Sequence, residues 1–294
     1  MPTKDIENGA HTLPMKEFNL SLMMVENPAI VMVAKRGAGK SWVCRAILKH
    51  FNDIPCGLII APTDRMNCFY GDFFPESYIH YDYKSEIIEK LLYRQTIMID
   101  KENEYKKKGK RIDPRAFIVM DDCLSKKGSW VKDQPITELL YNGRHYKIMY
   151  ILTMQFPLGI SPELRGNFDY AFLLADDITS NIKRIHEHYA GVFPDFNSFK
   201  EVFTQVTSNF GSLVIVNRGP RASFQEKVFY YKAADTGNNI KMGSKQFRQF
   251  HEKNFDKNWK QKKKSFDINK FCQKKKQDKS TIQVNMLENE NENK

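Results

Sequence analysis

The stretch AIVMVAKRGAGKS, residues 29–41, decides the fold of this 294-residue chain. Its first six residues form an apolar run that predicts a buried strand, and a helix is expected from Lys40 to about Phe51. Between them, residues 34–41 match the Walker A phosphate-binding pattern except that Ala34 replaces the first glycine. A strand, a glycine-containing loop and a helix in this order can aim backbone N–H groups and a helix dipole at phosphates.

Each position of this loop has an expected task in holding ATP and Mg²⁺. Gly37 and Gly39 supply the backbone freedom of a concave loop, Lys40 neutralises phosphate charge, and the Ser41 hydroxyl contacts Mg²⁺. A glycine-rich connection with an exposed lysine is the alternative interpretation, but the flanking strand and helix favour the nucleotide loop. The predicted nucleotide-binding residues are Ala34, Lys35, Arg36, Gly37, Ala38, Gly39, Lys40, Ser41 and Trp42.

A second apolar run, FIVMDD at residues 117–122, ends in two aspartates and has the pattern of a Walker B strand. Asp121 is the expected Mg²⁺ ligand, through water, together with Ser41. Asp122 is the expected base that orients the attacking water. The alternatives for Asp122 are a carboxylate in the outer metal shell or an N-cap of a helix before Leu124.

Further polar residues follow or precede the remaining predicted strands. Gln155 follows the strand predicted at 147–153, and at the carboxyl edge of the sheet it would lie beside the γ-phosphate, unless it only makes a loop hydrogen bond. Arg144 and Arg165 are candidates for a positive charge delivered to the transition state from a neighbouring subunit. Either arginine could instead form a surface ion pair.

The apolar runs along the chain predict an α/β fold with a mostly parallel sheet and helices on both faces. The predicted strands are 29–34, 57–61, 116–120, 147–153 and 170–174, followed by an antiparallel pair at 211–216 and 228–231. The predicted helices are 40–51, 85–109, 135–141, 181–189 and 196–207. We expect an N-terminal extension at 1–25, a P-loop NTPase domain at 26–234 and a basic extension at 235–294.

The net charge of +11 is concentrated near the C-terminus. Residues 1–240 carry a net charge of +3, whereas residues 241–279 carry +10, with lysine triplets at 262–264 and 274–276 between aromatic residues. Such a segment could neutralise phosphates and stack on bases. The alternative is a solvated, partly helical extension whose aromatic side chains pack on the main domain. Residues 287–294 are rich in Asn and Glu and are expected to be disordered.

The composition excludes several classes of protein. Hydrophobic residues make up 41% of the chain, which excludes a fully disordered protein. No apolar run approaches the roughly 20 residues that cross a bilayer, so we expect no membrane span, and residues 1–11 lack the pattern of a signal peptide. The five cysteines are scattered without a CxxC pair, which favours reduced thiols and argues against a zinc site.

Four stretches resemble the FtsK–HerA superfamily of P-loop ATPases, and more closely the poxvirus-type genome-packaging ATPases of large nucleocytoplasmic DNA viruses. The resemblance runs from about Ile30 to Asp176, in VMVAKRGAGKS, FIVMDD, NGRHYKIMYILTMQ and PLGISPELRGNFDYAFLL. It implies a RecA/FtsK-like fold, contact of Gln155 with the nucleotide, and Arg144 as an arginine finger acting on the neighbouring subunit, with Arg165 as second choice. Ala34 departs little from the pattern, but Asp122 stands where bacterial relatives have Glu.

The same resemblance implies an ATPase that drives double-stranded DNA into a capsid. Such motors are homo-oligomeric rings, often hexamers, so duplex DNA and capsid or capsid-vertex proteins are the implied partners. The implied location is the viral factory in the infected-cell cytoplasm, and the virion as well. The basic segment Lys106–Arg111 is a candidate DNA contact. A nucleoside or nucleotide kinase and a non-hydrolysing nucleotide-binding scaffold are the competing interpretations; the sequence contains no clear Arg-rich lid for a kinase.

Overall fold

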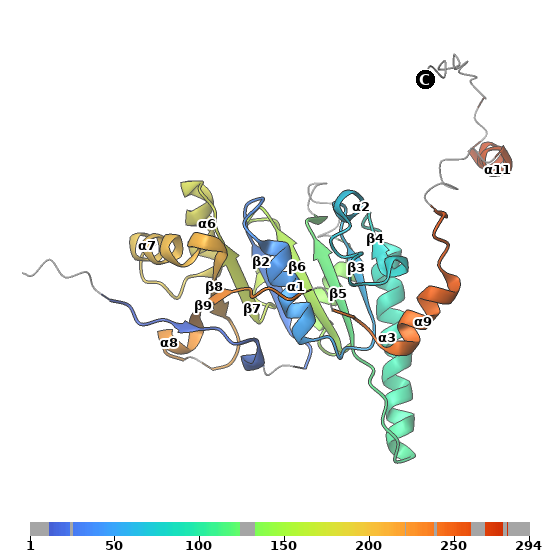
Figure 1. Ribbon diagram of the computed structural model, residues 1–294, viewed down its shortest axis with the longest axis horizontal. Coiled ribbons are helices and arrows are strands. Elements are labelled where there is room, and N and C mark those ends of the chain that lie inside the picture. Colours follow the sequence, from blue (N-terminus) through green and yellow to red (C-terminus); the bar gives the residue numbers. More distant parts are fainter. Residues whose placement is uncertain are drawn as a thin grey trace, which may run out of the picture. The chain divides into compact units, whose positions relative to one another are not determined.

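A nine-stranded sheet, with the strand order β1-β9-β8-β7-β2-β6-β5-β3-β4, forms the centre of the protein. The computed structural model describes residues 12–23, 26–123, 133–220, 222–237, 240–259, 268–278 and 281. The strands are β1 Lys16–Glu17, β2 Ala29–Val33, β3 Gly57–Ile60, β4 Ile79–His80, β5 Ala116–Asp121, β6 Ile148–Met154, β7 Tyr170–Leu174, β8 Gly211–Val216 and β9 Val228–Lys232 (Figure 1).

The helices alternate with the strands of the parallel part, as a sheet covered on both faces requires. They are α1 Lys40–His50, α2 Asp64–Asn67, α3 Ser85–Lys107, α4 Gln134–Asn142, α5 Pro162–Arg165, α6 Thr179–Tyr189, α7 Phe196–Val206, α8 Phe224–Lys227, α9 Lys245–Asn254 and α11 Ile268–Asp278. None of the described helices combines the length and the apolar character that a bilayer-spanning helix needs.

The predicted mixed topology is confirmed. Strands β4, β3, β5, β6, β2 and β7 pair in parallel, in that spatial order. Strands β7, β8 and β9 then pair antiparallel, and the short β1 closes the other edge in parallel with β9. The strand order places β6 between β2 and β5, so the two strands that lead to the Walker motifs are not direct neighbours.

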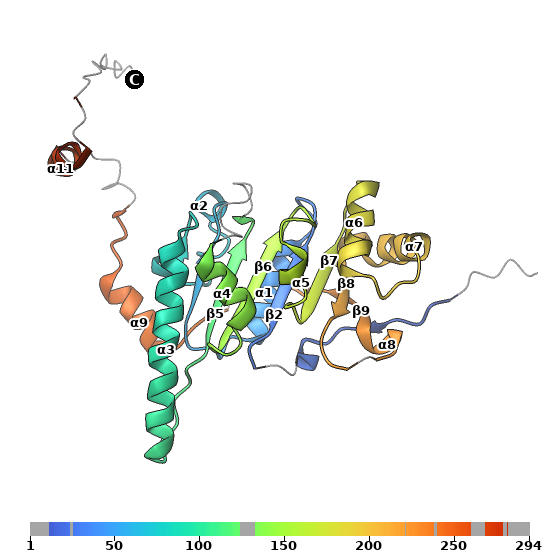
Figure 2. The same cartoon turned by 180° about the vertical axis from the view of Figure 1, so that it is seen from behind.

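Alternating side chains of the strands build two apolar layers, one on each face of the sheet. Ile30 and Met32 of β2 pack on the face covered by α1, whereas Val31 and Val33 pack on the face covered by α3, α4, α6 and α7. Figure 1 shows α1 in front of the sheet, and Figure 2 shows α4 and α5 in front of the opposite face. The predicted helices on both faces are therefore confirmed.

Both flanks of the predicted 26–234 domain pack on the sheet. The Phe18 side chain is 2% exposed and contacts the rings of Phe172 and Phe229. After β9, Met242 is fully buried and the Phe247 ring stacks on Tyr78 with a centroid distance of 4.0 Å. The chain forms two compact units, Met1–Glu252 and Lys253–Lys294. These contacts attach the residues before 26 and after 234 to the core of the first unit. The limits 26 and 234 of the domain stay a prediction.

Much of the predicted basic tail lies outside the described residues. These parts include Lys262–Lys264, Phe266 and residues 282–294, and Leu124 in the Walker B region lies outside as well. Within the second unit, the structure describes α11, whose sequence contains the second lysine triplet. Residues 241–252 hold Met242 and Phe247 and belong to the first unit, so the part of the tail that can be removed without cutting this packing begins at Lys253.

The close approach of β3 to β5 generates a stability prediction. Gly57 faces Phe117, and a Cβ atom at Gly57 would lie 2.4 Å from the Phe117 ring. We expect Gly57→Ala to lower the free energy of unfolding by about 1–3 kcal/mol, because the ring must leave its place in a packed core. Gly191→Ala is the matched control, since a Cβ atom there meets nothing within 4 Å. Urea unfolding measures both, and equal stability of the two variants would contradict the prediction.

The charge of the tail generates a second prediction. Residues 253–279 hold eleven lysines against three aspartates. We expect removal of 253–294 to flatten the dependence of log affinity for duplex DNA on log salt, because each neutralised phosphate contributes about 0.9 to that slope. Basal ATP turnover should stay near normal. Fluorescence anisotropy over a salt series measures the slope, and an unchanged slope and affinity would show that the tail does not contact DNA.

Candidate active site

The predicted phosphate-binding loop, residues 34–41, is held between the carboxyl ends of two strands. The Ala34 amide donates to the Met154 carbonyl of β6 at 3.1 Å, and the Lys35 amide donates to the Ala175 carbonyl after β7 at 3.2 Å. Gly37 and Gly39 have φ values of 79° and 94°, which only glycine adopts without strain. Ala34, at the position of the missing glycine, is fully buried and fits the core. The loop therefore leads from β2 into α1 as predicted.

Asp122 contacts two other predicted site residues, Lys40 and Gln155. One carboxylate oxygen of Asp122 forms an ion pair with the Lys40 ammonium group. The other accepts a hydrogen bond from the Gln155 amide at 3.0 Å. Asp122 has a φ of 49°, an uncommon backbone conformation for a residue other than glycine, and such strain is concentrated at functional sites. The structure thus brings together Lys40, Asp122 and Gln155, which lie far apart in the sequence.

Asp121 lies deeper than Asp122 and is held by two hydroxyl groups. Thr153 donates to one carboxylate oxygen of Asp121, and the Tyr70 hydroxyl donates to the other at 3.0 Å. Thr153 also accepts a hydrogen bond from the Asp122 amide at 3.1 Å. The register explains this arrangement, because Thr153 of β6 is paired with Asp121 of β5. A single threonine therefore orients both aspartates of the Walker B motif.

The surroundings of these groups alter their proton affinities. Burial raises the pKa of the Asp121 carboxyl, and the nearby Asp122 charge raises it further, whereas the Thr153 and Tyr70 hydrogen bonds and the Lys40 charge act in the opposite direction. Burial also raises the pKa of Tyr70 well above its usual value. Tyr70 consequently keeps its proton and serves as a hydrogen-bond donor to Asp121.

A cavity of about 710 Å³ opens beside the loop. Ligand pockets are typically about 300–1,000 Å³, so this volume suits a nucleotide. The lining of the cavity includes polar groups of the loop and Asp122, and also the aromatic residues Trp42, Phe69 and Phe210. Phe210 has a φ of 60° and lies against Gly39, while the Arg45 guanidinium lies 5.7 Å from the Trp42 ring centre. These aromatic side chains provide flat apolar surfaces against which a base can pack.

The donor groups around the cavity fit Mg²⁺ and a polyphosphate. Mg²⁺ prefers oxygen ligands and keeps several waters, and the Ser41 hydroxyl and the Asp122 carboxylate both line the cavity. Asp121 is 5% exposed, accepts hydrogen bonds from Tyr70 and Thr153, and is not among the residues that line the cavity, so its contact with Mg²⁺ through water stays a prediction. Among the predicted loop residues, Lys35, Arg36, Gly37, Gly39, Lys40, Ser41 and Trp42 line the cavity.

The two predicted arginines lie away from the loop at residues 34–41. Arg144 precedes β6 at the amino edge of the sheet and forms an ion pair with the buried Asp169, which also accepts from the Ala29 amide at 2.9 Å. Arg165 donates to the Ile160 carbonyl at 2.7 Å and lies over the Tyr189 ring. Neither arginine is among the residues that line the cavity.

Sequence reasoning missed three residues that the structure places at the site. Tyr70 lies in an irregular segment after α2, where nothing in the sequence signals a contact with the Walker B strand. Phe210 comes from the turn before β8. Thr153 had a signal, because it belongs to the Thr-x-Gln end of its strand, but that motif pointed to Gln155 rather than to the threonine.

Comparison with solved structures finds similar chains of low sequence identity. The genome packaging NTPase B204 from Sulfolobus turreted icosahedral virus 2, in complex with AMPPCP, is 15% identical with a TM-score of 0.48; the match covers 71% of this chain and 99% of that chain. The pCW3 conjugation coupling protein TcpA, in its monomer form with ATPgS, is 11% identical with a TM-score of 0.48; that match covers 76% of this chain and 65% of that chain.

Comparison of sequences finds viral relatives. No protein-family model matches the chain. The uncharacterized protein L437 of Acanthamoeba polyphaga mimivirus is 48% identical over 242 residues, which cover 82% of this chain and 84% of the relative. The uncharacterized protein 075L of Invertebrate iridescent virus 6 is 33% identical over 234 residues, covering 77% and 86%. The chain therefore belongs to the family of viral proteins that includes mimivirus L437 and iridescent virus 075L.

Proposed function

We propose that this protein hydrolyses ATP and uses the energy to move double-stranded DNA into a viral capsid. The observation that carries the hydrolysis is the contact of Asp122 with both Lys40 and Gln155, next to Asp121 held by Thr153, together with a nucleotide-sized cavity lined by Lys40 and Asp122. The movement of DNA is supported by the sequence resemblance to genome-packaging ATPases. The relatives are viral proteins, which supports a role in the infected cell. We place the protein in the viral factory and in the virion.

The site residues divide the work of hydrolysis. The loop amides and Lys40 bind the phosphates and balance their charge, which grows on the leaving ADP oxygen as the terminal P–O bond breaks. Mg²⁺, when bound through Ser41 and Asp121, adds charge neutralisation at the phosphate oxygens. Asp122 takes the proton of the attacking water, and the Gln155 amide orients that water and a phosphate oxygen. The Trp42, Phe69 and Phe210 side of the cavity receives the base.

Coupling to DNA requires several copies of the chain. We propose a homo-oligomeric ring, with a hexamer favoured, in which ATP lies between subunits and Arg144 of one subunit serves the site of the next. Hydrolysis releases this contact and thereby changes the relative positions of the subunits around DNA. Capsid or capsid-vertex proteins are the proposed docking partners of the ring.

The proposed hydrolysis predicts the effects of two substitutions. Lys40→Ala should lower ATP turnover by about 100-fold or more, because a group that balances transition-state charge is lost. Asp121→Asn should keep part of the nucleotide affinity but lose Mg²⁺-dependent turnover. Phosphate release measured at several Mg²⁺ concentrations, alongside nucleotide binding by calorimetry, tests both. Lys90→Ala, at an exposed lysine of α3, is the control and should hydrolyse normally.

Three results would contradict this proposal. Normal turnover in Lys40→Ala would remove the loop assignment, and normal turnover with a normal Mg²⁺ requirement in Asp121→Asn would remove the Walker B assignment. Phosphate transfer to a nucleoside or nucleotide acceptor, instead of to water, would identify a kinase. The oligomeric state by light scattering, and turnover with and without duplex DNA, test the ring and the coupling to DNA.

The proposed finger generates a prediction of its own. Arg144→Ala subunits should bind ATP and hydrolyse it poorly, and mixing them with Lys40→Ala subunits should restore part of the activity, because some interfaces then combine an intact loop with an intact arginine. Asp169→Asn is the control, because it removes the negative charge that pairs with Arg144 within the chain while keeping the arginine. Equal loss of activity in Asp169→Asn, or assembled mixtures without recovery, would assign Arg144 a structural role and direct attention to Arg165.

A further inference from the structure

The second half of α3 extends beyond the packed part of the protein. The buried side chains of this 23-residue helix are Ile88, Leu91 and Gln95, all in its first half. Twelve more residues follow Gln95 to the end at Lys107, which corresponds to about 18 Å of helix. Figures 1 and 2 show this end of α3 projecting past the sheet on the side away from the α2 and α6 ends of the molecule.

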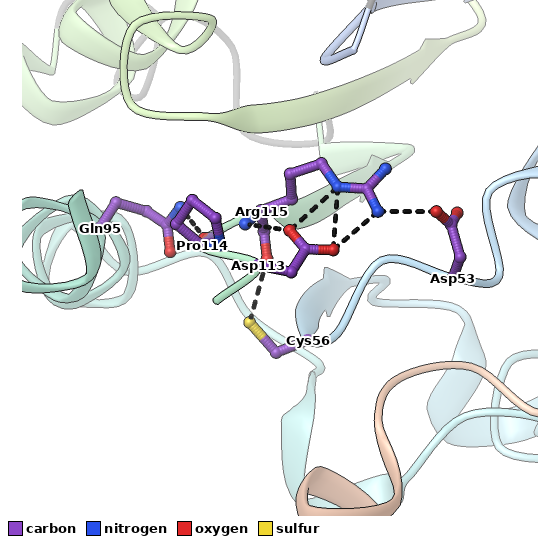
Figure 3. A network of polar contacts seen from close by, with 6 residues as sticks. All are labelled: Asp53, Cys56, Gln95, Asp113, Pro114 and Arg115. Atoms are coloured by element: carbon purple, nitrogen blue, oxygen red, sulfur yellow. Dashed lines mark hydrogen bonds and ion pairs between the residues drawn. The ribbon is translucent and has the colours of Figure 1, made fainter. Parts of the chain in front are cut away.

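The base of this projection is firmly anchored. The Gln95 amide is fully buried and donates to the carbonyls of Pro114 and Tyr146, both at 2.8 Å. Beside it, Arg115 forms ion pairs with Asp113 at 2.7 Å and with Asp53 at 2.6 Å (Figure 3). Further along α3, Glu102 forms an ion pair with Lys147 at 3.1 Å. These contacts fix the direction of the helix and of the segment that returns from it to β5.

The anchored helix ends in a cluster of positive charge. We name as the basic tip the segment Lys106–Arg111, in which five of six residues are cations, interrupted by Gly109. The side chains of the basic tip are exposed. Within the described part of the chain, Lys106 pairs with Glu102 at 3.2 Å, whereas the other four cations form no salt bridge. Five like charges repel one another unless an anionic partner lies against them.

We infer that the basic tip of α3 binds the phosphate backbone of duplex DNA. The inference rests on the proposed function, and it names the part of the folded domain that touches the substrate. Four of the five cations are lysines, which act as point charges and suit sequence-independent contact with phosphates. The tip has no apolar side chain among its six residues, whereas protein–protein interfaces are built around an apolar centre.

The position of the tip also fits a DNA contact. The P-loop and Asp122 lie at the carboxyl ends of β2 and β5, whereas α3 is fixed at Gln95 to Pro114 and Tyr146, which precede β5 and β6, so the tip projects from the amino edge of the sheet. DNA bound there does not compete with ATP for space. Because α3 is anchored by Gln95 and Glu102, a shift of the subunit carries the tip with it, and DNA phosphates bound to the tip move with the subunit.

The test uses the full chain and a duplex of mixed sequence. The variant Lys107→Gln/Lys108→Gln/Lys110→Gln removes three charges from the tip. If each lysine contacts one phosphate, the slope of log affinity against log salt should fall by about 2.7 and affinity near 0.1 M salt should fall by about tenfold or more. Lys90→Gln/Lys183→Gln/Lys200→Gln, at exposed lysines elsewhere, loses the same charge and should change the slope little. Replacing the same three tip lysines by arginine should retain the wild-type slope.

We also measure ATP turnover without DNA and with DNA for each variant. These two rates distinguish a loss of DNA contact from damage to the ATP site. The inference is supported if the glutamine variant of the tip keeps basal turnover and loses affinity, slope and stimulation, while the arginine variant keeps all three. It is overturned if the tip variant binds DNA like the wild type, or if the control variant loses as much slope. Absence of duplex binding by the wild-type protein would overturn the proposed DNA translocation itself, and the inference with it.

Discussion

The geometry of the site depends on the parallel pairing of β6 with both β2 and β5. Thr153 is paired with Met32 on one side and with Asp121 on the other. This register puts the Thr153 hydroxyl against the Asp121 carboxylate and under the Asp122 amide, and it puts Met154 where its carbonyl accepts from Ala34. A slip of one residue would turn Thr153 to the opposite face of the sheet. The loop, the two aspartates and Gln155 would then no longer meet.

A buried cluster of polar residues connects Asp121 to the protein interior through Tyr70 and Asp64. Tyr70 donates to Asp121 through its hydroxyl, and its own backbone amide donates to the Asp64 carboxylate at 2.7 Å. Tyr70 and Asp64 are almost fully buried. A buried carboxylate without partners would be costly, so the two hydroxyl donors around Asp121 are what makes an acidic group tolerable at that depth. The cluster links the Walker B strand to the segment that follows α2.

The sequence was sufficient for the fold class and for most elements, because long apolar runs can be buried only as strands of a covered sheet. Strands 170–174 and 211–216 have the predicted bounds, and the others differ by a residue or so at their ends. The two-residue strands β1 and β4 escaped prediction, since two residues carry no periodicity. The order of the strands also escaped it, because pairing depends on contacts between segments distant in the sequence.

In the site, too, features set by local sequence could be predicted, and features set by contacts between distant segments could not. Lys40 and the Asp121–Asp122 pair were predictable because local motifs specify them together with their flanking strands. The role of Thr153 depends on a neighbour chosen by strand order, and that of Tyr70 depends on an irregular segment, so neither could be inferred from local pattern. The pairing of Arg144 with Asp169 joins residues 25 apart in sequence and likewise required the fold.

The segment after β9 has a mechanical consequence for α1, the helix that begins at Lys40. Arg45 and Lys49 of α1 donate to the carbonyls of Gly237 and Thr236 at 2.9 and 3.0 Å, while the apolar side of the helix packs on the sheet. The helix is thus bonded on one side and packed on the other. It cannot slide along its axis like a piston without breaking both sets of contacts. A displacement of the loop before α1 is therefore passed to the sheet and to the segment after β9 together, because α1 joins the two as one rigid block.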